Sequence, residues 1–340
     1  MRRRPTSTVT STTVAPSVSV SKPATSPTVT RSQQLGINAG PNASIAVLDA
    51  CVELGVKWVR VSQEAGWAGA SITLGTTVQR AHDRGLKVIQ VIQRAGHKYD
   101  APDTIDVLKV FATNCASSGV DVIEIGNEWN GKMFWAAPDV NVMPPSRQSH
   151  VALAVAEHLR TVSPQTIVLT PGTSPAAEPL NAWTWLPQFY DTDLVRHQNV
   201  KWNGTAIHAF CYPELATTNP AQWNPLKQVP TIKTSLAQRA LSGSVWVTEI
   251  GAPGFATNAP VIRGIALTEQ RQAQCFEAYF QVIRDQEKVG IKYPTVIIAT
   301  MFDGQSATNS VEQGLGLITT TGRKKPAWTL VNKFAQEPML

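Results

Sequence analysis

The stretch Val122–Asn130 reads VIEIGNEWN and joins a run rich in β-branched residues to a glycine, an asparagine and a glutamate, Glu128. This order is typical of a buried strand that ends in a loop. A second stretch, Ser244–Pro253, reads SVWVTEIGAP and places Glu249 at the end of its own apolar run. Parallel α/β barrels deliver their active-site groups from strand ends of this kind. The two stretches therefore predict a parallel α/β fold with two carboxylates at one end.

From Gln33 onward, short apolar runs alternate with longer segments of helical period, which is the pattern of repeated βα units. The predicted strands are Gln34–Asn38, Val56–Ser62, Leu86–Gln93, Val120–Asn127, Thr166–Thr170, Gly204–Cys211, Ser244–Glu249 and Thr295–Phe302. The predicted helices are Ala43–Leu54, Thr73–Arg84, Thr104–Ser117, Arg147–Val162, Ala182–Tyr190, Pro225–Leu241, Thr268–Lys288 and Ala327–Phe334. This strict alternation predicts a closed (β/α)8 TIM barrel. A doubly wound sheet is the competing fold, but the first turn, Gly36–Gly40, lacks the GxGxxG phosphate-binding pattern.

The N-terminal segment, residues 1–32, is rich in Ser, Thr, Pro and Val and contains no aromatic or acidic residue. Such a segment buries too little apolar surface to offset the entropy of ordering it, so we predict a disordered tether before one barrel domain over residues 33–340. A secretory signal needs a continuous apolar core, which this segment lacks, whereas an acid-poor, Ser-rich transit peptide stays an alternative. We expect the tether to attach the domain to a larger assembly, such as a phage tail or a cell-surface assembly. The compartment stays open.

The composition excludes several classes of protein. Of the 340 residues, 43% are hydrophobic and 16% are charged, which is typical of a globular protein with a large core. The net charge of +6 is not gathered into a basic stripe with interleaved aromatic residues, so we expect no nucleic-acid partner. No run approaches the roughly 18 apolar residues of a membrane-spanning helix, so we expect no membrane insertion. The four cysteines are widely spaced without a CxxC pair, which predicts buried free thiols and no metal site.

The strand ends bring chemistry-bearing residues to one face. Because alternate residues of a strand face the same way, Glu124 and Glu128 share a face of the fourth strand, and Val247 and Glu249 share a face of the seventh. The same reasoning selects Arg60 on the second strand and the pair His208 and Tyr212 on the sixth. The fourth and seventh of eight strands lie nearly opposite each other, with room for one sugar between them. Two opposed carboxylates are the minimum that glycosidic bond cleavage requires.

On these residues the chain resembles the clan A retaining glycoside hydrolases from about Gln33 to Phe334. Asn127-Glu128 matches the family's Asn-Glu pair, which contains the acid/base, and Glu249 matches its nucleophile. Supporting groups of the clan are matched by Arg60, His208 and Tyr212. The motif in Val122–Asn130 is most similar to the β-xylosidase-like and cellulase-like families. The resemblance implies a retaining double displacement without a cofactor or a metal.

The resemblance also implies how a sugar is held. Asn127 is expected to hydrogen-bond the sugar 2-hydroxyl, and Trp67 and Trp129 are expected to stack on sugar faces. Many clan members carry a tryptophan at the end of the eighth strand, where this chain has Met301-Phe302-Asp303. The sugar platform of the clan is therefore not matched here, and Phe302 is a substrate-binding candidate. The aromatic residues near strand ends and the long loop Gly131–Pro145 favour a polysaccharide or cell-envelope glycan as the carbohydrate partner.

Other interpretations stay open. Arg60 could pair with a structural acid, Glu124, inside the barrel, and His208 could be a satisfied core histidine. A metal-dependent hydrolase would need several histidine and carboxylate ligands at strand ends, and His208 is the only histidine predicted there. The second functional hypothesis is a non-catalytic glycan-binding module, an adhesin or tail protein. Turnover of an activated aryl glycoside separates the two.

Overall fold

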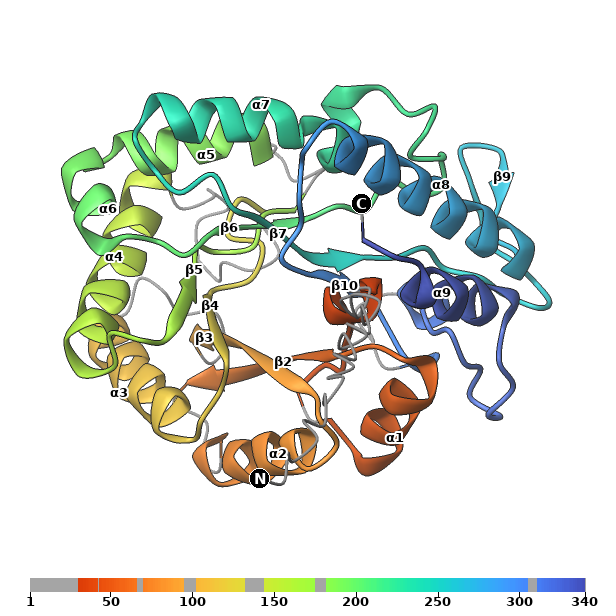
Figure 1. Ribbon diagram of the computed structural model, residues 1–340, viewed down its shortest axis with the longest axis horizontal. Helices are drawn as coiled ribbons and strands as arrows, with labels where there is room; N and C mark the ends of the chain where they lie inside the picture. Colours follow the sequence, from red (N-terminus) through yellow and green to blue (C-terminus); the bar gives the residue numbers. More distant parts are fainter. Residues whose placement is uncertain are drawn as a thin grey trace, which may run out of the picture.

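A computed structural model of the chain describes residues 30–41, 43–65, 70–94, 102–131, 144–174, 182–304 and 311–339. Within these ranges, parallel strands form a central barrel and helices form a ring around it (Figure 1). The predicted (β/α)8 TIM barrel is confirmed.

The barrel strands are short and all of their pairings are parallel. They are β1 (Leu35–Asn38), β2 (Trp58–Ala65), β3 (Lys87–Arg94), β4 (Val122–Ile125), β5 (Ile167–Leu169), β6 (Thr205–His208), β7 (Val245–Ile250) and β10 (Val296–Ile298). Their order around the barrel is β5-β4-β3-β2-β1-β10-β7-β6. Isolated parallel bridges, Leu169 with Gly204 and Thr173 with Ile207, join β5 to β6 and nearly close the barrel.

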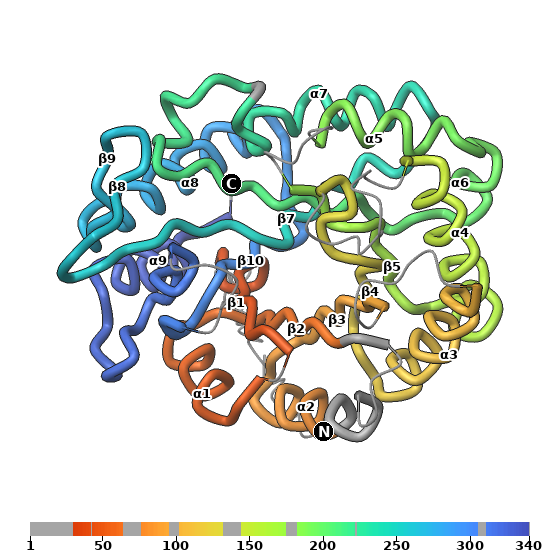
Figure 2. Tube along the Cα trace, turned by 180° about the vertical axis from the view of Figure 1, so that it is seen from behind, coloured from red at the N-terminus to blue at the C-terminus, as the bar shows by residue number. Residues whose placement is uncertain are grey.

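The helices follow the strands in turn, and Figure 2 shows the same ring from the opposite side. They are α1 (Ile45–Leu54), α2 (Ala70–His82), α3 (Thr104–Ser117), α4 (Pro145–Val162), α5 (Ala182–Asp191), α6 (Leu194–Val200), α7 (Pro225–Gln238), α8 (Glu269–Lys288) and α9 (Pro326–Gln336). The sequence analysis missed α6 and the hairpin of β8 (Val261–Ile262) and β9 (Ile265–Ala266). Both are too short to produce a periodic apolar pattern.

Local sequence signals explain where helices begin and end. The Ser44 hydroxyl accepts a hydrogen bond from the Val47 amide and so caps the first turn of α1. Gly55, with φ +84°, ends the same helix in the left-handed conformation that glycine adopts most readily. Asn224 and Thr268 cap α7 and α8 in the same way as Ser44 caps α1.

The barrel interior is apolar toward the N-terminal ends of its strands. Trp58 of β2 and Trp246 of β7 meet edge to face, with 5.9 Å between ring centroids. One layer of inward side chains completes this cluster: Ile89, Val122, Leu169, Ala206 and Ile297. Because this layer fills the N-terminal part of the barrel, the inward polar groups lie toward the C-terminal ends of the strands, where barrel enzymes have their active sites.

The fold begins before the predicted domain boundary. Arg31 is buried and pairs with Glu287 at 2.6 Å and with Glu337 at 3.4 Å, and its guanidinium lies over the Phe334 ring. Arg31 therefore belongs to the barrel domain, although the sequence analysis assigned it to the tether. Residues 1–29 of that tether lie outside the described residues.

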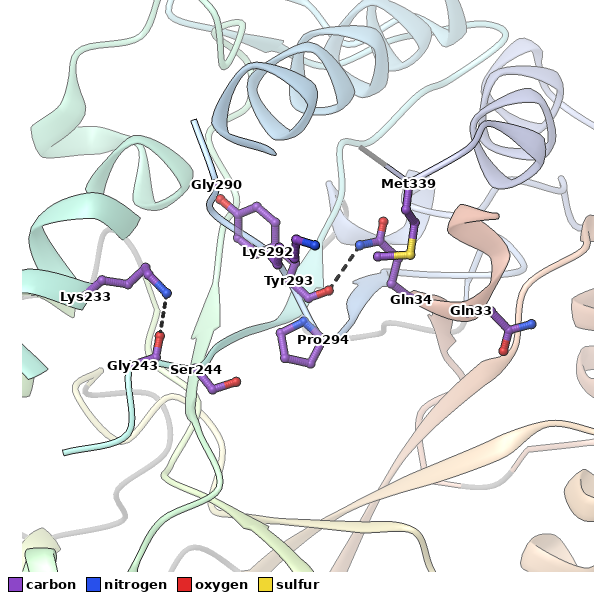
Figure 3. A pocket seen from close by; sticks show the side chains of 10 residues that line it. All are labelled: Gln33, Gln34, Lys233, Gly243, Ser244, Gly290, Lys292, Tyr293, Pro294 and Met339. Atoms are coloured by element: carbon purple, nitrogen blue, oxygen red, sulfur yellow. Dashed lines mark hydrogen bonds between the residues drawn. The ribbon is translucent and has the colours of Figure 1, made fainter. Parts of the chain in front are cut away.

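Three further findings complete the description of the fold. The four cysteines are buried free thiols, as predicted. A cavity of about 580 Å³ opens at the N-terminal end of the barrel, where Gln34, Ser244 and Pro294 precede β1, β7 and β10 (Figure 3). Among the helices of the described ranges, none has both the length and the apolar character needed to cross a membrane.

Candidate active site

Four barrel strands and the segment after β4 bring the acidic and basic groups together. Arg60 comes from β2, Glu124 from β4, His208 from β6 and Glu249 from β7, while Glu128 follows β4. One carboxyl oxygen of Glu128, one of Glu249 and a ring nitrogen of His208 all lie within 4.8 Å of one another. The two glutamates singled out in the sequence therefore converge.

Arg60 is the fixed cation of this cluster, and it contacts both of the acids proposed for it. Its Nε and Nη2 donate to the two oxygens of Glu124, each at 2.9 Å, and its Nη1 donates to Glu249 Oε1. Nη2 also donates to Asn127 Oδ1 at 2.9 Å. Burial alone would lower the pKa of Arg60, but the Glu124 and Glu249 charges raise it overall, so the guanidinium stays charged.

Glu124 is a buried, ionised acid that supports Arg60. Burial acts to raise the pKa of Glu124, but the Arg60 charge and hydrogen bonds from His208 and Arg60 hold it below its ordinary value. Thr248 Oγ1 donates to the same carboxylate at 3.3 Å. This agrees with the interpretation of Glu124 as a structural acid, although Glu124 and the candidate catalytic residues share Arg60.

His208 lies between three carboxylates. Its Nδ1 lies 2.8 Å from Glu128 Oε1 and 3.8 Å from Glu249 Oε2, and its Nε2 lies 3.6 Å from Glu124 Oε1. Burial favours the neutral ring, but the Glu249 charge and hydrogen bonds to Glu124 and Glu128 raise the pKa of His208 to about 9. The raised pKa favours the charged ring, whose Nδ1 donates to Glu128.

Glu249 has two donors on one of its oxygens. Oε1 accepts a hydrogen bond from Asn38 Nδ2 at 2.8 Å as well as one from Arg60 Nη1. Burial raises the pKa of Glu249 above its ordinary value, His208 and Arg60 act in the opposite direction, and Glu128 and Glu124 raise it further. Its side chain is 14% exposed, so a ligand can reach the carboxylate.

A β-bulge, not regular alternation, turns Glu249 inward. Val247 pairs with Ile207 of β6, while the next residue of β6, His208, pairs with Glu249, so β7 has one extra residue there. The same shift occurs against β10. Trp246 below the bulge faces the barrel interior and Val247 packs in the outer core. The predicted shared face of Val247 and Glu249 is therefore wrong, because the bulge changes the parity of the strand.

Glu128 also reaches the site through irregular backbone. β4 ends at Ile125, two residues before the predicted end, and Gly126 follows with φ +89°. Glu128 itself has φ +48°, a left-handed conformation that costs a side-chain-bearing residue about 1 kcal/mol. Strained backbone of this kind is found at functional sites, where the surrounding structure maintains it.

Trp129 does not lie where a sugar could stack on it. Its side chain is fully buried, and a Cβ added to Gly126 would lie only 2.1 Å from its indole ring. The glycine lets the chain pass over the ring. The predicted stacking role of Trp129 is corrected to a core role, because a buried ring has no free face.

Three of the other predicted contacts, Asn127, Tyr212 and Phe302, follow the ends of β4, β6 and β10. Asn127 is nearly buried and accepts from Arg60, and Phe302, just beyond the end of β10, is half-buried and packs on the core. Tyr212 is half-buried beside Phe210, and burial raises its pKa to about 12, with contributions from Glu312 and Glu128. Trp67 lies outside the described residues, as does most of the loop Gly131–Pro145.

Three residues of the site escaped the sequence analysis. Asn38 is a polar residue at the end of the first strand, a signal that could have been used. Thr248 was expected to face away from the barrel, but it lies two residues after the inward Trp246 on the same face, and its hydroxyl donates to Glu124. Gly172 lies so close to the cluster that an added Cβ would be 2.5 Å from both Glu124 Oε1 and His208 Nε2. No local pattern marks this glycine.

Glu128, His208 and Glu249 are also residue types that bind metals, with ligand atoms close enough to share an ion. A metal-bound histidine must be neutral, however, and His208 favours its charged form. Arg60 already occupies Glu249 Oε1. An ion bound at this cluster would therefore have to displace the proton of His208.

Comparison with known proteins shows the fold. Neither a scan against family models nor a search of curated proteins finds a match. Among solved structures, a family 39 glycoside hydrolase from Bacteroides cellulosilyticus WH2 has a TM-score of 0.63 and 15% sequence identity, covering 91% of this chain and 65% of that one. The chain thus spans just under two thirds of that protein.

Two other solved structures have the same fold. A GH5_18 protein from Streptomyces cattleya, in complex with GlcNAc, has a TM-score of 0.64 and 17% identity over 90% of this chain and 80% of that one. A glucosidase from Croceicoccus marinus has a TM-score of 0.65 and 12% identity over 89% of this chain and 67% of that one. The chain has the barrel fold of these glycoside hydrolases.

Proposed function

We propose that the protein is a retaining glycoside hydrolase that cleaves a polysaccharide or cell-envelope glycan with Glu249 as nucleophile and Glu128 as acid/base. The observation that carries this proposal is the approach of the Glu128 and Glu249 carboxyl oxygens to within 4.8 Å. Retaining enzymes have carboxyl groups about 5–5.5 Å apart, whereas inverting enzymes leave room for a water at about 6.5–9.5 Å. The distance favours the retaining arrangement.

In the first step, a lone pair of the Glu249 carboxylate forms a bond to the anomeric carbon. The bond from that carbon to the glycosidic oxygen breaks, its electron pair moves to the oxygen, and the oxygen takes the proton of Glu128. Because Glu128 Oε1 accepts from His208 Nδ1, the second oxygen of Glu128 is the one available to hold and deliver this proton. The product is a glycosyl ester of Glu249 and a free leaving group.

In the second step, Glu128 acts as a base. Its carboxylate takes a proton from a water, the water oxygen bonds to the anomeric carbon, and the electron pair of the ester bond returns to Glu249. Arg60 stabilises the returning negative charge through its contact with Glu249 Oε1. The sugar leaves with the configuration with which it entered.

The charges of the cluster support these roles. Arg60 and His208 carry two positive charges, and Glu124 and Glu249 carry two negative charges when both are ionised. With Glu128 uncharged, the formal charges of these four groups cancel. This is the protonation state that the first step requires.

The solved structures of similar fold support a carbohydrate partner, since they include a glucosidase and a protein in complex with GlcNAc. As part of the same proposal, residues 1–32 attach the barrel to a larger assembly, such as a phage tail or cell-surface assembly. Asn127 contacts the sugar 2-hydroxyl, and Phe302 and Trp67 contact sugar faces.

A panel of activated aryl glycosides tests the function. We expect the native chain to hydrolyse at least one of them with retention of configuration, which NMR of the first-formed anomer measures. We expect Glu249→Gln to reduce kcat by ~10⁴-fold or more. Glu157→Gln is the matched control, because it removes a surface carboxylate that pairs with Arg196. Inversion would contradict the mechanism. Glycan binding without turnover in the native chain would favour the alternative, a glycan-binding module.

A further inference from the structure

Asn38 holds the candidate nucleophile from the first strand. Its Nδ2 donates to Glu249 Oε1 at 2.8 Å, while its own Oδ1 accepts from the Gly40 amide at 3.2 Å. Because the backbone donor occupies the carbonyl side of the amide, only the NH2 side can face Glu249. The backbone of β1 is fixed at this point as well, since Asn38 pairs with Arg60 and the Ala39 amide donates to the Arg60 carbonyl at 2.8 Å.

The two oxygens of Glu249 differ as a result. Oε1 receives both hydrogen bonds, from Asn38 and from Arg60. Oε2 faces His208 Nδ1 at 3.8 Å, which is beyond hydrogen-bond distance. Among the described residues, therefore, only Oε1 is held by donors.

We infer that Asn38 is a positioning residue that fixes Glu249 Oε1 as the held oxygen and leaves Oε2 as the oxygen that attacks the anomeric carbon. This inference rests on the proposed function and goes beyond it by assigning the roles of the two oxygens. In the glycosyl ester, Oε1 becomes the carbonyl oxygen and keeps its donors. Oε2 carries the bond to the sugar.

The inference has an electrostatic consequence that can be measured without a substrate. A donor to a carboxylate favours the ionised form, so Asn38 lowers the pKa of Glu249 relative to a chain without it. Burial and the neighbouring acids act in the opposite direction and raise that pKa. Asn38 thus counteracts the environment that would otherwise protonate the nucleophile.

The test is a 13C NMR titration of the glutamate side-chain carboxyl carbons, with the Glu249 signal assigned through Glu249→Gln. We expect Asn38→Ala to raise the titration midpoint of Glu249 by about one pH unit, the size expected for losing one charge-assisted hydrogen bond. The isosteric Asn38→Asp should raise it further, because it replaces the donor with a carboxyl group and preserves packing. Asn332→Ala is the control, since Asn332 donates to the Leu54 carbonyl on the helical layer.

An unchanged midpoint in a folded Asn38→Ala or Asn38→Asp chain overturns the inference. Where the native chain hydrolyses aryl glycosides, the acidic limb of kcat/KM should move upward with the NMR midpoint in Asn38→Ala, and a limb that stays in place also overturns the inference. Absence of turnover in the native chain would refute the proposed function, while the NMR series would still decide whether Asn38 holds Glu249.

Discussion

At the scale of single residues, the pH response of the site depends on His208 and Glu249. The pKa of His208, raised from 6.5 to about 9, means that the charged ring is kept well above neutral pH and loses its proton near pH 9. We therefore expect kcat/KM to fall as the pH rises through about 9, because a neutral His208 removes the positive charge between the acids. On the acidic side, activity should be lost as Glu249 is protonated, above the ordinary glutamate value of 4.5.

A pH–rate profile measures both limbs, which are properties of the coupled cluster and not of one residue. The His208→Gln chain should lose the alkaline limb near pH 9, and its acidic limb should move upward because His208 lowers the pKa of Glu249. A native profile that already falls near pH 6.5 would contradict the charge state assigned to His208.

Gly172 provides a second prediction at this scale. A Cβ on this residue would lie 2.5 Å from both Glu124 and His208, so Gly172→Ala must displace one or both side chains. We expect kcat/KM to fall by about 10²-fold, the size of effect that a displacement of about 1 Å has in an active site. Gly243→Ala is the matched control, because its Cβ would meet only the Lys233 amine at 3.9 Å. Equal activity in both variants would show that the site tolerates the shift.

At the scale of elements, the sequence was sufficient to find every barrel strand and the helix that follows it. Buried strands are continuous apolar runs and the helices have a clear period, so both leave a pattern in the sequence. The orientation of the candidate catalytic side chains depends on local departures from these patterns. The bulge in β7 and the left-handed Glu128 determine where the two acids point, and neither follows from residue type alone.

The helical layer has its own titratable residue, His197 of α6. It contacts the Ser149 hydroxyl of α4 at 2.7 Å and the Phe189 carbonyl of α5 at 3.0 Å, and it accepts from Trp202 Nε1 at 3.0 Å. Burial lowers the pKa of His197 from 6.5 to about 4. The folded state therefore disfavours the charged ring that the unfolded chain adopts in acid.

The sign of the resulting effect on stability follows from linkage. Because the folded pKa is depressed, this stability is present above pH 6.5 and is lost as the pH falls toward 4, by about 3 kcal/mol in total. Urea unfolding at about pH 7.5 and about pH 5 should show a smaller loss of unfolding free energy in His197→Asn than in the native chain. Equal losses in the two chains would mean that His197 does not titrate on unfolding.

At the scale of the whole molecule, the barrel has its apolar interior layer at one end and its charged cluster at the other. The apolar layer around Trp58 and Trp246 fills its N-terminal part, while Arg60 and the three acids occupy the opposite end. The sequence predicted one part of this division, the gathering of the carboxylates at one end, because strands that end in carboxylates bring them to the same rim. It could not predict the contacts of Asn38 and Gly172, which depend on residues distant in sequence.

The extra residue of β7 determines what a one-residue deletion in this strand would change. Without Thr248, Glu249 would follow Val247 directly, and the pairings of Val247 with Ile207 and of Glu249 with His208 would both be kept. The chain would lose the hydroxyl that donates to Glu124. Such a deletion would therefore leave Glu249 opposite His208 and weaken only the support of Glu124.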